Sequence, residues 1–111
     1  MVDCIFCKII NKEIKTVLVH EDEKFIAFND INPIAPLHLL IIPKEHIDSI
    51  NHLEEKNKEL IGELFLTAQK IAKEQKVDQT GYRLVINVGK DAGQTVSHLH
   101  LHLLGRKELL M

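Results

Sequence analysis

The first part of the chain consists of short hydrophobic runs separated by polar segments. The runs cover residues 17–20, 25–28 and 38–42 and contain many branched and aromatic side chains. Acidic residues at 21–23 and a proline-containing segment at 30–36 separate them. Short runs of this composition between turn-forming residues are typical of β-strands, so we predict three strands here.

The hydrophobic pattern changes its period between residues 51 and 76. Apolar side chains there recur every three or four positions among Glu, Lys and Gln, namely at Leu60, Ile61, Leu64, Ala68, Ile71 and Ala72. This spacing places them on one face of an α-helix. We predict one long amphipathic helix over residues 51–76, and we expect a short helical turn over residues 5–11.

Alternation of apolar and polar residues returns in the last third of the chain. Residues 82–88 alternate, and a polar, glycine-containing turn at 89–94 separates them from a final run that begins at His98. We expect both runs to be strands. Five strands and one main helix predict a single domain over residues 1–111 with an α+β sandwich architecture.

The final run alternates histidine with leucine. His98, His100 and His102 are separated by Leu99 and Leu101. A strand projects successive side chains to opposite faces, so the imidazoles would share one face while the leucines pack on the other. A neutral imidazole can attack phosphorus while its neighbours donate hydrogen bonds, which makes this face a candidate active site. A polar strand face that happens to contain histidine is the alternative interpretation.

Charge and composition argue against two classes of partner. Lys and Arg total 14 against 16 Asp and Glu, so the chain lacks the basic stripe that binds a nucleic-acid polymer. No apolar run approaches the roughly 20 residues of a membrane span, and residues 1–4 do not resemble a secretion signal. We therefore expect a cytoplasmic protein, in which a cysteine pair indicates a metal site or redox pair rather than a disulfide.

The loop that precedes the histidines offers groups that bind phosphate. Residues 90–97 combine backbone N–H groups near Gly93 with the hydroxyls of Thr95 and Ser97. Such groups can hold phosphate oxygens. On local grounds alone, a polar hairpin turn explains the same residues.

Three segments together resemble the histidine triad family of nucleotide hydrolases and transferases. Residues 93–104, Gly-Gln-Thr-Val-Ser-His-Leu-His-Leu-His-Leu-Leu, resemble the family signature, while residues 28–46 resemble its second block and residues 5–10 its first. The similarity covers essentially the whole chain and comes closest to the branch of histidine triad nucleotide-binding proteins. It implies the family's fold, a five-stranded antiparallel sheet with one long helix and a short N-terminal helix.

The resemblance implies a nucleoside monophosphate pocket and gives its catalytic residues roles. His100 would attack the α-phosphorus and form a transient nucleotidyl-histidine, which water then hydrolyses. His102 and Thr95 would contact the phosphate or the leaving group, and His38 would orient the imidazoles. A nucleophilic imidazole needs an acceptor for its other nitrogen and donors for the phosphate oxygens, which agrees with these roles. Taken alone, His38 is also consistent with a half-buried sheet histidine.

The resemblance also implies which residues bind the rest of the nucleotide. Asn87 and the Gly93 backbone would hold phosphate oxygens, and Asp30 would accept hydrogen bonds from the ribose hydroxyls. Apolar side chains would enclose a purine base, namely Phe6, Ile9, Ile14 and Ile31. Local sequence alone explains Asp30 as a turn cap and the apolar residues as core.

Cys4 and Cys7 form half of a tetrahedral zinc site, which needs two further nitrogen or sulfur ligands. By resemblance to zinc-binding members of the family, these ligands are His46 and His98. Four protein ligands leave no open coordination position, so the zinc would be structural. A redox pair and two idle thiols are the alternatives.

The function that these expectations favour is a hydrolase that cleaves nucleoside 5′-phosphoramidates or acyl nucleotides without a metal in the chemistry. A homodimer is expected, formed through the long helix and a sheet edge as in relatives. The alternatives are a dinucleoside polyphosphate hydrolase, a nucleotide-binding regulatory module with incidental hydrolysis, and a zinc-stabilised interaction domain.

Overall fold

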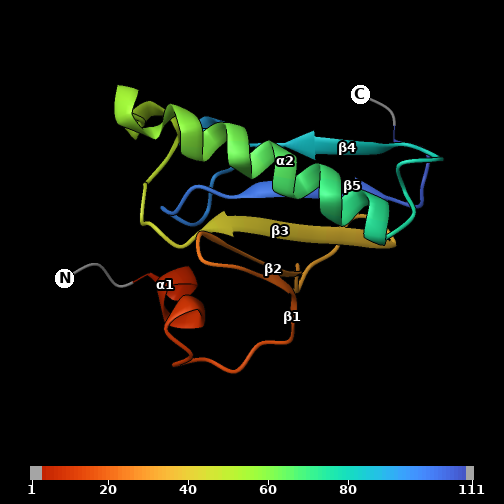
Figure 1. The fold of residues 1–111 in the computed structure, drawn as a ribbon, viewed down its shortest axis with the longest axis horizontal. Coiled ribbons are helices and arrows are strands. Elements are labelled where there is room, and N and C mark those ends of the chain that lie inside the picture. The colour runs from red at the N-terminus through yellow and green to blue at the C-terminus, as the bar shows by residue number, and fades with distance from the viewer. Residues whose placement is uncertain (1–3, 110–111) are drawn as a thin grey trace.

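The computed structural model describes residues 4–109 as two helices packed on a five-stranded antiparallel sheet (Figure 1). The helices are α1 (Ile5–Ile10) and α2 (Lys58–Glu74), and the strands are β1 (Leu18–Glu21), β2 (Phe25–Asn29), β3 (Leu37–Pro43), β4 (Tyr82–Val85) and β5 (Leu101–Gly105). This arrangement confirms the expected α+β fold. Within the described residues, neither helix combines the length and the apolar character that crossing a membrane requires.

The sheet order is β1-β2-β3-β5-β4, so β5 inserts between β3 and β4. The first three strands form a meander, and α2 then carries the chain to the far edge of the sheet. In the register of β3 and β5, His38 lies opposite Leu104 and Leu40 lies opposite His102. The two central strands therefore bring a histidine from each half of the chain to the middle of the sheet.

Alternation along the strands divides the core into two layers, one on each face of the sheet. The layer under α2 contains Leu39, Ile41, Leu101 and Leu103 together with the buried face of the helix. The opposite layer is closed by α1 and contains Phe6, Ile9, Ile26, Phe28, Leu40 and Ile42. In Figure 1, α2 runs along β3 and β5, whereas α1 lies away from it near β2. The leucines next to the triad histidines thus pack under α2, as predicted.

Helix α2 begins later than the hydrophobic pattern predicts. Residues 51–57 form two short 3₁₀ turns, Ile50–His52 and Glu55–Asn57, with extended backbone at Leu53 between them. Ser49 caps the first turn, and Asn57 accepts a hydrogen bond from the Glu54 amide at 2.8 Å. These side chains bond to nearby backbone groups and stabilise separate turns instead of one continuous helix.

The histidine-containing strand is shorter than predicted. β5 begins at Leu101, so His98 and His100 lie in the connection that leads into it, and β4 ends at Val85 rather than at residue 88. The Leu99 amide donates to the Ile47 carbonyl at 2.7 Å instead of joining the sheet ladder. The connection keeps the alternation of buried leucine and histidine but is supported by a neighbouring loop.

Candidate active site and metal cluster

A pocket of about 240 Å³ lies on the α1 side of the sheet. It combines apolar side chains with one carboxylate, one carboxamide, one hydroxyl and two imidazoles. The lining residues are Ile5, Phe6, Ile9, Phe28, Asp30, Ile31, Asn32, Leu40, Thr95, Val96, His100 and His102. Mostly apolar walls with a few polar groups are typical of sites for small organic ligands.

His100 is positioned by the backbone of its neighbour in the triad. Its Nδ1–H donates to the His98 carbonyl at 2.7 Å, so Nε2 carries the free lone pair. The ring is buried and contacts Phe6 edge-on, with ring centroids 5.2 Å apart. The centroid of His102 lies 5.0 Å away on the other side. An oriented, unprotonated nitrogen on the pocket wall is what a nucleophile requires.

The other two imidazoles form a relay with a defined direction. The Ile34 amide donates to Nδ1 of His38 at 3.2 Å, so the proton of the neutral His38 ring is on Nε2. That proton is donated to Nδ1 of His102 at 2.9 Å. His102 consequently carries its own proton on Nε2. The relay therefore leaves His102 with a donor N–H at Nε2, the ring atom at which neutral His100 has a lone pair.

Burial keeps the relay uncharged. Desolvation, followed by the charges of His100 and His38, lowers the pKa of His102 from 6.5 to about 4. The pKa of His38 is also lowered, mainly by burial, and Asp30 opposes that shift. Near neutral pH both rings are therefore neutral, so His102 acts as a hydrogen-bond donor and not as a cation.

Asp30 caps a turn and also lines the pocket. Its Oδ1 accepts the Asn32 amide at 2.8 Å, which caps the turn after β2. Its Oδ2 lies 3.3 Å from Nε2 of His38, and the residue lines the pocket. One carboxylate oxygen thus stabilises the loop while the other belongs to the polar end of the pocket.

The structure brings only some of the predicted nucleotide contacts to the pocket. Phe6, Ile9 and Ile31 line it together with Asp30 and Thr95, whereas other predicted residues do not, namely Ile14, Asn87 and Gly93. Ile14 is exposed on the segment after α1. Asn87 donates to the Ala92 carbonyl at 2.9 Å, and the Gly93 amide donates to Lys90 at 3.0 Å. Asn87 and Gly93 therefore brace the turn before the triad.

The four predicted metal ligands do converge. Cys4, Cys7, His46 and His98 place their ligand atoms within 4.8 Å of one another. The distance from Cys7 Sγ to His46 Nδ1 is 3.2 Å, and Nδ1 of His98 lies 3.4 Å from Cys4 Sγ and 3.6 Å from Cys7 Sγ. A tetrahedral ion with usual Zn–S and Zn–N bonds separates its nitrogen and sulfur ligands by about 3.5 Å. We call these four residues the metal cluster, and their spacing fits zinc.

The surroundings of the metal cluster leave the correct histidine nitrogens free. Nε2–H of His98 donates to the Pro43 carbonyl at 2.8 Å, and Nε2–H of His46 donates to Asp48 at 2.7 Å. Both Nδ1 lone pairs therefore face the cysteines, the usual arrangement around a ligating imidazole. Burial, with the neighbouring Cys4, raises the pKa of Cys7 to about 11, so binding of a metal would release its thiol proton.

Sequence reasoning missed the side chains that connect these two sites. Gln94 bonds to three backbone groups and Asp48 supports a predicted metal ligand. A polar turn and an acidic residue gave no local signal of these bonds, because the Asp48 carbonyl is distant from Gln94 in the sequence and the shorter-range bonds depend on irregular loop conformation.

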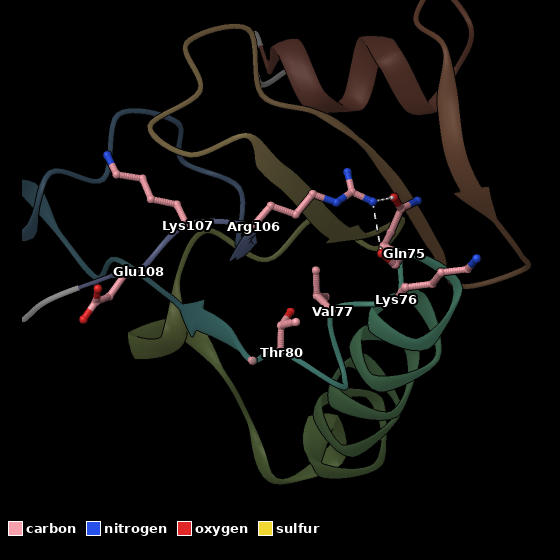
Figure 2. A pocket seen from close by; sticks show the side chains of 8 residues that line it. Gln75, Lys76, Val77, Thr80, Arg106, Lys107 and Glu108 are labelled. Carbon is pink, nitrogen blue, oxygen red and sulfur yellow. Dashed lines mark hydrogen bonds between the residues drawn. The ribbon is translucent and has the colours of Figure 1, made fainter.

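A larger hollow, of about 760 Å³, lies at the C-terminal end of α2 (Figure 2). It is open, and its lining includes the basic residues Lys76, Arg106 and Lys107 but no histidine or cysteine. Arg106 donates to the Gln75 carbonyl at 3.0 Å, which satisfies the C-terminal end of α2. Basic side chains at the negative end of a helix have a structural explanation.

Known proteins are similar in sequence to this chain over nearly its full length. A family model described as "Scavenger mRNA decapping enzyme C-term binding" matches residues 3–109. Protein HitA of Neisseria gonorrhoeae is 48% identical over 105 residues, which cover 95% of this chain and 97% of that protein. The chain belongs to the histidine triad (HIT) family. The resemblance inferred from its three motif segments is thereby confirmed.

Solved HIT structures have the same fold. A histidine triad protein from Clostridium difficile is 47% identical with a TM-score of 0.96, covering 100% of this chain and 96% of that chain. A HIT family hydrolase from Legionella pneumophila is 46% identical with a TM-score of 0.95, covering 97% and 96%. The sheet, the long helix and the short N-terminal helix are therefore those of the HIT fold.

Proposed function

We propose that this HIT protein is a hydrolase that releases a nucleoside monophosphate from nucleoside 5′-phosphoramidates or acyl nucleotides. The observation that carries the proposal is the hydrogen bond from His100 Nδ1–H to the His98 carbonyl, which in the neutral ring places the lone pair on Nε2 at the pocket wall. The likeness to a protein described as a HIT family hydrolase supports the same reaction class.

The first step forms a bond from His100 Nε2 to the α-phosphorus. The bond from phosphorus to the leaving group breaks, and its electron pair departs with that group. A carboxylate leaving group needs no proton, whereas an amine takes one from water. The phosphorylated His100 ring is a cation, which the carbonyl at 2.7 Å stabilises, while His102 donates Nε2–H to a phosphate oxygen or the leaving group.

In the second step, water attacks the phosphorus and loses a proton to solvent. The bond between phosphorus and His100 breaks, and the ring returns to its neutral form with the proton still on Nδ1. No metal takes part in either step. His38 positions His102 through their 2.9 Å hydrogen bond, and Thr95 supplies a hydroxyl at the phosphate end.

The remaining pocket residues suit the nucleoside. Phe6, Ile9 and Ile31 offer an apolar surface to a purine base, and Asp30 offers an acceptor to the ribose hydroxyls. Ile14, Asn87 and Gly93 lie outside the pocket lining; Asn87 and Gly93 support the turn before the triad, and Ile14 is exposed.

We assign structural zinc to the metal cluster. When bound, zinc would link Cys4 and Cys7, at the start of α1, to His46 in the loop after β3 and to His98 in the connection before β5. Ligand spacing and the two free Nδ1 lone pairs support this assignment. The free thiols also fit a reducing compartment, so the cytoplasm is the proposed location.

The proposed assembly is a homodimer through α2 and the edge of β4. Phe65 and Leu66 on α2 are 42% and 63% exposed, and Tyr82 on β4 is 36% exposed. β4 has a neighbour on one side only, so its other edge has backbone groups free to pair. Pairing two copies would cover the apolar residues and the strand edge together.

Mass spectrometry after mixing with an adenosine 5′-phosphoramidate tests the function. Quenched wild-type protein should carry an adenylyl group on the peptide that contains His100, and adenosine monophosphate should accumulate. His100→Ala should lose the adduct and at least about a thousandfold in turnover, because the nucleophile is absent.

The control is His52→Ala, which makes the same change at an exposed histidine that is not part of the pocket lining. It should keep both the adduct and the turnover. Turnover that survives in folded His100→Ala would refute the mechanism.

A further inference from the structure

We propose that Gln94 is a positioning residue that couples the metal cluster to the phosphate end of the nucleotide pocket, so that metal and nucleotide bind cooperatively. The inference rests on the proposed nucleotide site and adds a regulation to it. Neither Gln94 nor the coupling follows from the four ligands or from the triad alone.

The Gln94 side chain uses both ends of its amide. Nε2 donates to the Asp48 carbonyl at 2.7 Å and to the Val96 carbonyl at 3.1 Å, while Oε1 accepts the Gly89 amide at 2.9 Å. The residue is half-buried. One side chain thus joins the loop after β3, the turn before the triad and the segment that enters the triad.

One end of this connection reaches the metal cluster. The Asp48 carboxylate accepts Nε2–H of His46, and the adjacent Ile47 carbonyl accepts the Leu99 amide, both at 2.7 Å. A metal bond to Nδ1 would fix the orientation of the His46 ring and, through it, the position of Asp48. The position of the Asp48 carbonyl, which accepts the Gln94 amide, would therefore depend on whether the metal cluster holds an ion.

The other end reaches the nucleotide pocket. Val96, whose carbonyl accepts from Gln94, lines the pocket beside Thr95. Gly89, whose amide donates to Gln94, has φ of 80° and begins the turn that leads there. A shift of the Gln94 amide would move the Thr95 hydroxyl relative to His100 and His102.

A second connection runs through the triad itself. The His98 side chain belongs to the metal cluster, and the His98 carbonyl holds Nδ1–H of His100. Changing this connection would also remove a metal ligand or the nucleophile. Gln94 is the connection that can be removed while both sets of functional side chains remain, which makes it the residue to test.

The coupling has a reciprocal thermodynamic signature. If zinc raises the affinity for a nucleotide by some factor, the nucleotide must raise the affinity for zinc by the same factor. Couplings between sites are typically about 5- to 150-fold, and we expect about tenfold here. A residue that only stabilised the fold would leave this factor unchanged.

The experiment measures the coupling factor in both directions. Calorimetry gives the affinity for adenosine monophosphate of zinc-loaded and zinc-stripped protein, and competition with a chelator gives the zinc affinity with and without adenosine monophosphate. Both affinities should rise about tenfold in the wild type. In Gln94→Met, which keeps the chain length and removes the amide, the factor should fall to less than about half of the wild-type value while both ligands still bind, because only the connection through His98 remains.

Two variants separate the amide donor from a general loss of packing. Gln94→Glu keeps an acceptor for the Gly89 amide but places a carboxylate against two carbonyls, so it should weaken the coupling as well. Gln79→Met makes the same chemical change as Gln94→Met at an exposed position and should keep the full factor.

The outcomes distinguish the coupling from the function. Absence of adenosine monophosphate binding in every state would overturn the proposed function and the coupling together. Equal nucleotide affinity with and without zinc would overturn the coupling alone, and a wild-type factor that is unchanged in Gln94→Met would overturn the role of Gln94 in it.

If circular dichroism shows that the zinc-stripped chain unfolds, cobalt(II)-loaded protein provides the reading. Adenosine monophosphate should shift the cobalt–thiolate absorption bands in the wild type and shift them less in Gln94→Met. Bands that do not respond in the wild type although the nucleotide binds would overturn the coupling.

Discussion

Different hydrogen-bond partners give chemically identical side chains different states in the triad. His100 donates Nδ1–H to a carbonyl and presents a lone pair, whereas His102 accepts at Nδ1 and presents an N–H. Their rings are 5.0 Å apart, so nucleophile and donor can face one phosphoryl group. The division of roles therefore depends on which hydrogen bond each ring makes with its neighbour.

We expect His102 to lose its proton at an unusually low pH in the nucleotide-free protein. Burial and the neighbouring His100 and His38 lower its pKa to about 4, and protonation would also break the bond from His38. NMR titration of the histidine ring protons between about pH 4 and pH 8 measures this value. The signal that disappears in His102→Asn identifies the residue.

The same shift has a definite sign in stability. The unfolded chain binds this proton near pH 6.5, whereas the folded chain binds it only near the lowered pKa of about 4. The free energy of unfolding should therefore decrease as the pH falls through that interval. A midpoint near 6.5 for His102 would contradict the buried, uncharged relay.

At the scale of residues, the sequence predicted which residues belong to the sites better than it predicted their hydrogen-bond partners. Alternating histidines indicated the reactive face, and the four ligand types were found by resemblance before the fold brought them together. The bond from Gln94 to Asp48 joins loops that are distant in the chain, and the shorter-range bonds of Gln94 and of Asp48 follow from loop conformations that no spacing rule predicts. Residue types carry chemistry, whereas hydrogen-bond partners follow from the fold.

Among the elements, α1 depends most on contacts outside itself. It has six residues, too few for an isolated helix to be stable in water. Phe6 and Ile9 bury its inner face, and the Cys4 thiolate or thiol sulfur accepts the Cys7 amide at its N-terminus. The helix that forms one wall of the pocket is thus held by core packing and by the metal cluster.

Cys7→Ser should release zinc and lower the melting temperature. A serine hydroxyl is a poor zinc ligand, and the metal bond that fastens α1 would be lost, which we expect to cost at least about 5 °C. Elemental analysis should fall from one zinc per chain toward none, and calorimetry gives the melting temperature.

The matched control for this prediction is Ile10→Val, a small change on the same helix that removes no ligand. It should keep its zinc. Full zinc content in purified Cys7→Ser would refute the assignment of the metal cluster.

Element types were predictable and their ends were not. Every predicted strand and both helices are present, because periods of two and of three to four residues follow from strand and helix geometry. The start of α2 moved to Lys58, since Ser49 and Asn57 stabilise separate turns. β5 begins at Leu101, since the Leu99 amide bonds to a loop carbonyl. Both differences arise from competing hydrogen bonds.

For the whole molecule, the two faces of the sheet have separate tasks. One face is covered by α2 and forms a continuous apolar core, and the other combines a smaller core with the pocket and the metal cluster. The outer surface of α2 and the β4 edge lie away from that pocket. They are therefore available for the proposed association of two copies.

Leu66→Lys should weaken the homodimer. The side chain is 63% exposed in the single chain, and a buried charge in its place would disfavour association by at least about tenfold in the dissociation constant. Analytical ultracentrifugation over a range of concentrations measures the constant.

Val17→Lys makes a similar change at a residue that is 84% exposed near the opposite edge of the sheet, and it should leave the constant unchanged. The reverse result, with Val17→Lys disruptive and Leu66→Lys silent, would place the interface at β1.

The alternation that separates the two faces also makes folding and activity interdependent. A shift of β5 by one residue against β3 would turn His102 under α2 and expose Leu101 and Leu103 in the pocket. Such a chain would have neither a core nor a reactive face. A length change in the loop before β5 is therefore not expected to produce a stable but inactive protein, and loss of activity by that route should coincide with degradation.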